Sequence, residues 1–274
     1  MQTQARAIRP PAVAGLFYPA DAAVLAATVA DLLAAAPPAR SGSVAPKAVI
    51  APHAGYIYSG ATAARAYALL QPLRGRIRRV VLLGPTHRVA VRGLAVPGVT
   101  HFRTPLGDIP LDGQAIAALR GLPQVVVSDA AHAQEHSLEV HLPFLQTVLG
   151  DFELVPLAVG DASPEDVAQV LRRVWGGDET LIVVSSDLSH FHRYAAAQTL
   201  DRATAGAILE LRTDLDHEQA CGATPVCGLT LLARELGLQP ELVDLRNSGD
   251  SCGDRDRVVG YAAFAFREPA HHDR

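Results

Sequence analysis

The chain is poor in cysteine and has no paired cysteine motif. Its 274 residues include only Cys221, Cys227 and Cys252, and no two of them have a CxxC spacing. Such a sparse, odd count is more typical of free thiols in a reducing cytoplasm than of a disulfide framework. Long apolar runs are also missing, which excludes a bilayer-spanning helix, and the first residues lack the apolar core of a signal peptide. We therefore expect a cytoplasmic protein that does not associate with membranes.

An excess of basic residues is absent as well. Lys and Arg number 24 against 28 Asp and Glu, which gives a formal net charge of -4. A nucleic-acid-binding surface would show a basic excess or stripe, so we expect no nucleic-acid partner. The hydrophobic share of 49% is enough for a core. No repeat or composition break divides the chain, which favours a single domain over residues 1–274.

Short apolar segments rich in β-branched residues alternate with helical patterns along most of the chain. This alternation predicts an α/β fold, a layered sheet with helices on both faces. Asp21, Ser59 and Ser163 are each placed to cap the helix that follows. We expect strands at 47–51, 79–83, 92–96, 124–128, 153–159, 180–184, 241–245 and 257–266, and helices at 22–36, 61–70, 112–119, 163–175, 195–211 and 225–236, while 133–149 enters a helix near Pro143.

Three of the expected strands end in polar loops that carry histidine. Pro52 stops the first strand and His53 follows it. The second strand is followed by Gly-Pro-Thr and His87, and the third by Ser-Ser-Asp-Leu-Ser and His190. Ligands of open α/β sheets bind at the carboxyl ends of the strands. The pattern therefore predicts one shared site along that edge.

His53 and His87 are the candidate metal ligands of this site. Imidazole suits iron, copper and zinc, and two histidines with one further ligand leave coordination positions open for a substrate. A single loop histidine more often bonds only to the backbone. Two histidines at matching strand ends favour the metal interpretation.

The segment EHSLEVH, residues 135–141, holds further polar groups. His136 is a candidate general acid or base, and Glu135 or Glu139 is expected to orient it. The spacing is not the HExxH of zinc proteases, which excludes that class. We interpret His141, near the apolar face, as a core residue.

The loop after the third strand, SSDLSHFH, combines Asp187 and His190. We expect the carboxylate to orient the imidazole for proton transfer, with His192 as an alternative to His190. Ser185 and Ser186 lack the GxSxG surroundings of a serine hydrolase, which argues against a nucleophile.

The loop at 248–254, SGDSCGD, could supply a third metal ligand through Asp250 or Cys252. An ordinary turn is the alternative. The loop lacks the lysine and the following helix of a phosphate-binding P-loop.

Several of these motifs together resemble one known family. RPPAVAGLFYPAD, APHAGYIYSG, LLGPTHR, EHSLEVHLPFL, SSDLSHF and SGDSCGDRDRVVGYAAFAF occur in the order found in the Memo family. They span nearly the whole chain. The resemblance implies a fold similar to the class III extradiol dioxygenases (LigB-like), which hold non-haem iron with two histidines and a glutamate.

By this resemblance, His53 and His87 match the two metal-binding histidines. His136 and His190 match the catalytic histidines around the metal, and Asp187 matches a pocket carboxylate. The third ligand differs, because the dioxygenases use glutamate and animal Memo proteins use cysteine. A gapless match places Ser251 there, with Cys252 one residue further on, so we expect Cys252 to serve.

Two functions are expected from these patterns. The first is a metal-dependent oxidoreductase with Fe(II), for which copper or zinc are alternatives. The second is a non-enzymatic module that binds a metal, a peptide or a small molecule in the same pocket. Hydrolysis by zinc-bound water is a third, less favoured interpretation. The resemblance also implies association with AMMECR1-like and radical SAM proteins.

Overall fold

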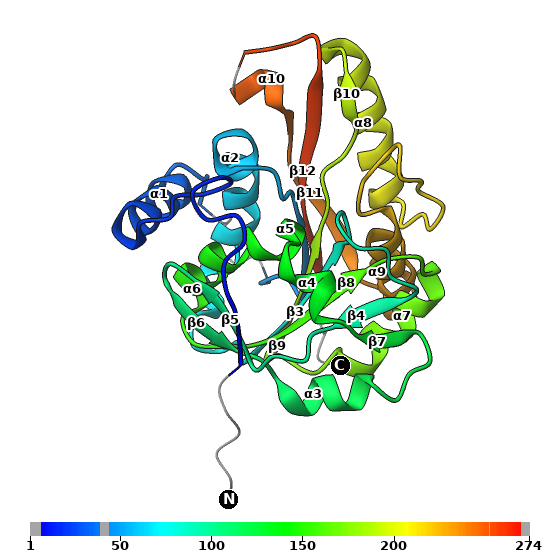
Figure 1. Ribbon diagram of the computed structural model, residues 1–274. Helices are drawn as coiled ribbons and strands as arrows, with labels where there is room; N and C mark the ends of the chain where they lie inside the picture. Colours follow the sequence, from blue (N-terminus) through cyan, green and yellow to red (C-terminus); the bar gives the residue numbers. More distant parts are fainter. Residues whose placement is uncertain (1–6, 39–43, 252, 270–274) are drawn as a thin grey trace, which may run out of the picture.

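The computed structural model describes residues 7–38, 44–251 and 253–269 (Figure 1). Within these ranges, a nine-stranded mixed sheet forms the centre and a three-stranded sheet lies beside it. Helices cover both faces of the large sheet, so the expected layered α/β fold is confirmed. None of the helices in the described ranges is both long and apolar enough to span a bilayer.

The centre of the large sheet is parallel and its flanks are antiparallel. The strand order is β10-β12-β2-β9-β3-β8-β4-β7, and β11 pairs with β12. β2, β9, β3 and β8 run parallel, whereas β12 is antiparallel to β2 and β4 is antiparallel to β8. The small sheet has the order β1-β5-β6. The strands are β1 (Ile8–Arg9), β2 (Ala48–Ala51), β3 (Arg79–Pro85), β4 (Leu94–Val96), β5 (His101–Thr104), β6 (Gly107–Pro110), β7 (Val125–Val127), β8 (Glu153–Val159), β9 (Thr180–Ser185), β10 (His190–His192), β11 (Gln239–Asn247) and β12 (Val258–Arg267).

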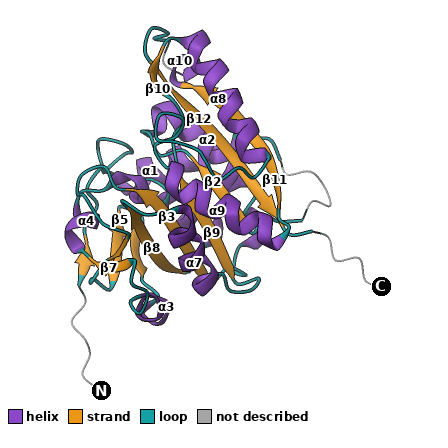
Figure 2. Cartoon of the chain, turned by 90° about the vertical axis from the view of Figure 1, so that its right-hand side faces the viewer, coloured by secondary structure: helices purple, strands orange, loops and turns teal. Residues whose placement is uncertain are grey.

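Two groups of helices enclose the sheet. The helices are α1 (Ala22–Ala34), α2 (Tyr56–Ala68), α3 (Gly113–Leu119), α4 (Asp129–Ala133), α5 (His136–Glu139), α6 (Leu142–Leu149), α7 (Pro164–Val174), α8 (Tyr194–Leu209), α9 (Ala223–Leu236) and α10 (Ser248–Ser251), with a 3-10 turn at Gln71–Leu73. α1, α2 and α6 contact one another on one face. α7 and α9 pack together on the other face, which is turned toward the viewer in Figure 2. The core lies between these layers, where β2, β3 and β9 are almost wholly buried.

Two of the three expected helix caps are confirmed. The Asp21 carboxylate accepts hydrogen bonds from the first backbone amides of α1, and Ser163 forms a capping box with Asp166 at the start of α7. The expected cap at Ser59 is wrong, because α2 begins at Tyr56 and the Ser59 hydroxyl donates to Ala54 O at 2.9 Å. The buried Tyr56 hydroxyl donates to Val140 O at 2.7 Å and its amide donates to Phe17 O at 2.8 Å, so tertiary contacts hold the first residue of the helix.

Regular structure occurs in the segment 101–111, for which the sequence predicts a loop or short strands, and in the segment 247–256, for which it predicts a loop. The segment between His101 and Pro110 forms the antiparallel pair β5–β6. Residues 248–251 form the short helix α10 rather than a loop. Pro143 lies in the first turn of α6, as its missing amide hydrogen requires.

The N-terminal arm is held on the body by the buried carboxylate of Glu139. This carboxylate pairs with the Arg9 guanidinium and accepts hydrogen bonds from the amides of Ala12 and Val13 at 2.7 and 3.0 Å. The Tyr18 hydroxyl donates to it at 2.5 Å. Both ionic partners are almost wholly buried, with side-chain exposures of 4% and 0%. One carboxylate therefore ties residues 9–18 to α5.

His132 is a buried histidine of α4 on the side of the arm. Its Nε2 lies 2.9 Å from Ala95 O and donates to it, while Nδ1 has no partner among the described residues. Burial lowers the pKa of His132 to about 4, only partly opposed by the bond to Ala95. The folded state therefore holds this imidazole in its neutral form.

We expect Glu139→Gln to lower the free energy of unfolding by about 3–5 kcal/mol, because it leaves the buried Arg9 charge unpaired. Urea denaturation would measure this change. Glu235→Gln is the control, because the exposed pair of Glu235 with Arg172 contributes at most about 1 kcal/mol. Equal, small effects of the two substitutions would show that Glu139 does not hold the arm.

We expect His132→Gln to make the stability of the protein less sensitive to acid. The folded-state pKa lies below the unfolded value of about 6.5, so the unfolded chain binds this proton first as the pH falls. The wild type should therefore lose up to about 1.4 kcal/mol of stability per pH unit from this group between pH ~6.5 and ~4. Glutamine can still donate to Ala95 O. Parallel pH profiles of wild type and variant in urea denaturation would contradict this assignment.

Candidate metal centre

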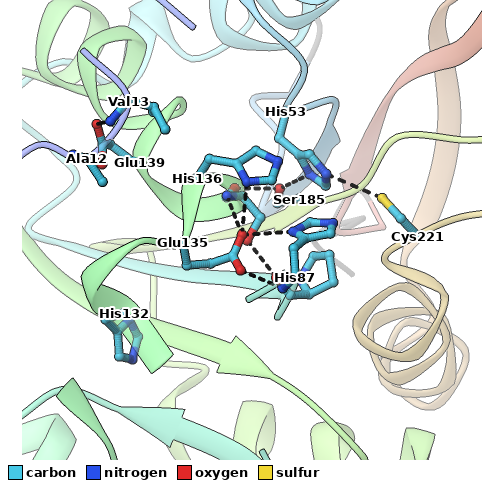
Figure 3. Close-up of polar contacts among 12 residues, drawn as sticks. Ala12, Val13, His53, His87, His132, Glu135, His136, Glu139, Ser185 and Cys221 are labelled. Atoms are coloured by element: carbon cyan, nitrogen blue, oxygen red, sulfur yellow. Dashed lines mark hydrogen bonds and ion pairs between the residues drawn. The ribbon is translucent and has the colours of Figure 1, made fainter. Parts of the chain in front are cut away.

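Three histidines meet at the carboxyl edge of the parallel strands. His53 follows β2, His87 follows β3, and His136 begins α5. One ligand atom of each lies within 4.8 Å of the ligand atoms of the other two. The ring centroids are 5.2 Å apart for His53 and His87, 5.4 Å for His53 and His136, and 4.6 Å for His87 and His136. The three rings are drawn together in Figure 3.

The sheet order explains why these histidines meet. β9 lies between β2 and β3 and runs parallel to both, so all three strands end at the same edge. Gly84 lets α5 approach the end of β3, since a Cβ there would lie 2.8 Å from Ser137 Oγ and 3.1 Å from Ser185 Cβ. This close packing carries His136 to the histidines at the strand ends.

Hydrogen bonds define which nitrogen of His53 is free. Ser185 Oγ donates to Ser137 O at 2.6 Å, so it accepts from His53 Nδ1, also at 2.6 Å. His53 is therefore the tautomer with hydrogen on Nδ1 and a lone pair on Nε2. The serine orients the imidazole, which agrees with the expectation that Ser185 is not a nucleophile.

Glu135 performs the same task for His87. Its carboxylate accepts from the His87 amide at 2.6 Å and from His87 Nδ1 at 2.8 Å. It also accepts from the Ser137 amide at 2.9 Å and lies 3.3 Å from His136 Nδ1. Of the two acids expected to orient His136, Glu135 contacts it, whereas Glu139 holds the N-terminal arm. His87, like His53, keeps a lone pair on Nε2.

The electrostatics favour the neutral form of two of these imidazoles, His53 and His136. Burial, reinforced by the charges of the neighbouring histidines, lowers the pKa of His53 well below its ordinary value. Burial and the charge of His87 lower the pKa of His136 to about 4. Burial would raise the pKa of Glu135, but its hydrogen bonds from His87 outweigh this effect and bring the pKa to about 2. His53 and His136 are thus neutral nitrogen donors beside an ionised Glu135 carboxylate, which is the state of imidazole and carboxylate that binds a metal ion.

Asp187 and His190 lie at the same edge but do not form the expected pair. Asp187 accepts from the His53 amide at 2.8 Å, and between the described side chains of Asp187 and His190 there is no hydrogen bond. Burial raises the pKa of Asp187 to about 7 despite that amide. Burial lowers the pKa of His190, whose strand β10 pairs with β12. The acid thus orients the His53 loop and remains poised to exchange a proton near neutral pH.

The closing loop offers no free ligand among its described residues. Cys252 lies outside the described residues. Asp250 Oδ1 accepts from the Tyr194 hydroxyl at 2.5 Å, and its Oδ2 accepts from the Asn247 amide at 3.0 Å. Ser251 is exposed, and its Oγ lies 3.2 Å from the carbonyl oxygen of residue 248. The alternatives Asp250 and Ser251 are therefore occupied in fixing α10.

Sequence reasoning missed Cys221. Its sulfur lies 3.3 Å from His53 Nε2, the nitrogen that carries the lone pair (Figure 3). Cys221 precedes α9 and is separated from His53 by 168 positions. The available signal was the pair Cys221-Gly222 directly before a predicted helix. A glycine at that place lets the backbone pack closely on a neighbouring strand, which brings the preceding side chain near it.

An apolar groove opens beside the histidines. Its cavity of about 530 Å³ is lined in part by Leu16, Phe17, Tyr56, Ile57 and Tyr58. The Phe17 ring lies 4.8 Å from the His136 ring, centroid to centroid. Phe17 therefore connects the groove with His136, while none of the three histidines itself lines the groove.

The chain is similar to one protein family along nearly its whole length. A family model described as Memo-like protein matches residues 9–265. A MEMO1 family protein of Aquifex aeolicus is 35% identical, with 94% of this chain and 99% of the relative aligned. A MEMO1 family protein of Ignicoccus hospitalis is also 35% identical, with 96% of this chain and 99% of the relative aligned. An uncharacterized protein from Escherichia coli K12 shares the fold, with a TM-score of 0.53 at 14% identity over 80% of this chain and 98% of that one. The chain belongs to the Memo family.

Proposed function

We propose that this Memo-family protein is a metal-dependent oxidoreductase related to the class III extradiol dioxygenases. The observation that carries the proposal is the convergence of His53, His87 and His136, with ligand atoms within 4.8 Å of one another. The metal is Fe(II), with copper or zinc as alternatives that an imidazole site also accepts.

The residues present fit a metal ion. His53 and His87 would hold it through Nε2, because their Nδ1 hydrogens are bonded to Ser185 and Glu135. Such outer partners fix the tautomer and orientation of metal-binding histidines. Bound iron(II) would supply redox chemistry toward dioxygen and a Lewis acid for a substrate oxygen. Glu135 contributes a negative charge that favours a cation at the site.

The remaining polar residues act on protons. Neutral His136 and His190 accept a proton from a substrate hydroxyl, since the pKa of each is lowered by burial. Asp187, with a pKa of about 7, exchanges a proton near neutral pH. These three residues are the proposed catalytic groups.

The groove is the proposed binding site for the organic ligand. Its aromatic lining suits a flat, largely apolar molecule, and Phe17 at the boundary directs that molecule toward His136. A peptide side chain would also fit, which supports the alternative of a non-enzymatic binding module. The proposal includes a cytoplasmic location and the AMMECR1-like and radical SAM partners implied by the family.

We expect anaerobically purified protein to bind about one Fe(II) per chain, measured by elemental analysis, and to lose it in the double variant His53→Ala, His87→Ala. His101→Ala is the matched control, because His101 lies on β5 and bonds to Thr100. Full metal content in the double variant would contradict the proposed site.

We expect oxygen consumption with catechols or similar enediols, and a roughly 10²–10⁴-fold loss of the rate in His190→Ala. Metal content should be unchanged in this variant, because His190 transfers a proton and does not hold the metal. An oxygen electrode measures the rate. Metal binding with no product in a single-turnover assay would favour the non-enzymatic binding module instead.

A further inference from the structure

Phe191 has an unusual backbone conformation beside His190. Its φ is 62°, and among the described residues Leu211 is the only other non-glycine residue with a positive φ. A bulky side chain rarely adopts the left-handed region, because its Cβ lies too close to the backbone. Strained residues of this kind cluster at ligand-binding and catalytic positions, where the surrounding structure holds them. Phe191 is therefore a candidate for a role beyond folding.

Phe191 is the extra residue of a bulge in β10. His190 is opposite Val259 on β12 and His192 is opposite Val258, so two adjacent residues of β12 face two residues of β10 that are two positions apart. Adjacent residues of a strand point to opposite faces, and a bulge re-aims the side chains around it. His190 and His192 therefore lie on opposite faces of the sheet.

The bulge turns His190 toward the metal centre and His192 toward α8. A Cβ on Gly260 would lie 2.2 Å from the Asp201 carboxylate of α8, and residue 260 is two positions after the partner of His192, on the same face of β12. His190 is on the other face. Burial lowers the pKa of His190, and the charge of His87 adds to this effect. His190 rather than His192 therefore belongs to the site.

Hydrogen bonds hold the chain on both sides of the bulge. Before it, the Ser189 amide donates to Asp201 Oδ1 at 3.0 Å, and Ser189 O accepts from the Gly260 amide at 2.8 Å. After it, the Tyr194 amide donates to Arg255 O at 2.9 Å. These bonds fix the two ends of the bulge, so the strained conformation between them persists in the folded protein.

The Phe191 ring faces solvent rather than the core. Its exposure is 61%. The Arg257 guanidinium lies over the ring, 4.9 Å from its centroid, and the His190 ring lies 5.7 Å away at an interplanar angle of 65°. The cation and the imidazole fix the orientation of the ring. The exposed part is a flat apolar surface beside the imidazole that is proposed to accept a substrate proton.

β10 and β12 form a wall beside the metal centre. β12 pairs with β2 from Phe264 to Phe266, so its first residues continue past the carboxyl end of β2 and pair there with β10. Figure 1 shows β10 and β12 rising with α8 above the rest of the sheet. Phe191 on this wall lies beside His190, as Phe17 on the N-terminal arm lies beside His136.

We propose that Phe191 is a substrate-contacting residue, whose exposed ring surface packs against an aromatic ring of the ligand that reaches His190. The inference rests on the proposed function and narrows its ligand to an aromatic rather than an open-chain enediol. Stacked and edge-to-face aromatic pairs gain energy beyond apolar burial, so this ring selects aromatic ligands. Arg257 is a positioning residue that keeps the ring in place.

Anaerobic equilibrium dialysis of the full chain tests this contact with two probes, the aromatic 4-nitrocatechol and the open-chain enediol dihydroxyfumarate. Phe191→Leu keeps an apolar side chain but removes the ring. We expect it to weaken 4-nitrocatechol binding about 2–12-fold and to leave dihydroxyfumarate binding unchanged. Phe191→Tyr should bind both probes like the wild type. Leu236→Ala is the control, because Leu236 is 44% exposed at the end of α9.

Phe191→Asn separates a binding role from a structural one. Asparagine tolerates the left-handed region better than phenylalanine, so the melting temperature should not fall. The affinity for 4-nitrocatechol should nevertheless decrease, because the ring is lost. A lower melting temperature with unchanged affinity would show that Phe191 serves the fold alone.

The possible results separate this inference from the proposed oxidoreductase activity. Equal weakening of both probes in Phe191→Leu, or full affinity for 4-nitrocatechol, would overturn the inference. Phe191-dependent binding without oxygen consumption would support the inference and count against the oxidoreductase. Oxygen consumption with full 4-nitrocatechol affinity in Phe191→Leu would do the reverse. Failure of the wild type to bind 4-nitrocatechol would also overturn the inference.

Discussion

The buried carboxylate of Glu135 is the interaction on which the site depends. It accepts hydrogen bonds from the amide and the ring of His87 and from the Ser137 amide, and it contacts His136. A buried negative charge costs free energy unless it is paired or hydrogen-bonded. Moving any of these donors away from Glu135 would therefore destabilise the fold, which keeps the donors in place. The same charge lowers the energy of a cation among the imidazoles. One residue thus fixes the geometry of the cluster and its preference for positive charge.

The parallel order of β2, β9 and β3 places the ends of the three strands, and the residues that follow them, at one edge of the sheet. Two residues at the end of β9 serve the loop after the neighbouring strand β2: Ser185, the last residue of β9, orients the His53 ring, and Asp187 accepts a hydrogen bond from the His53 amide. Ser185, which the sequence already argued against as a nucleophile, and Asp187 therefore form the framework that orients His53. Since the strand interiors are apolar and buried, these loops carry nearly all the chemistry of this edge.

The sequence predicted the strands and their terminal histidines because short apolar runs and chain breakers such as Pro52 are local signals. It failed where distant residues decide the outcome. α2 begins at Tyr56, whose hydroxyl and amide bond to Val140 and Phe17, contacts that no local pattern reveals. Glu135 and Glu139 are four positions apart, and only the packed arm shows that they have different roles. Cys221 is near His53 only because Gly222 packs against β9.

The N-terminal arm connects the Glu139 anchor with the apolar groove, and Tyr18 belongs to both. The Glu139 carboxylate accepts hydrogen bonds from the amides of Ala12 and Val13. Leu16, with 81% of its surface exposed, and Phe17 line the groove further along the arm. Substitutions of Leu16 or Phe17 therefore remove none of the hydrogen bonds to Glu139. Exchanging one or two side chains on this turn would change which molecules fit the groove. The histidine cluster and the free energy of unfolding would remain nearly the same. The arm would then be the natural starting point for redesigning selectivity.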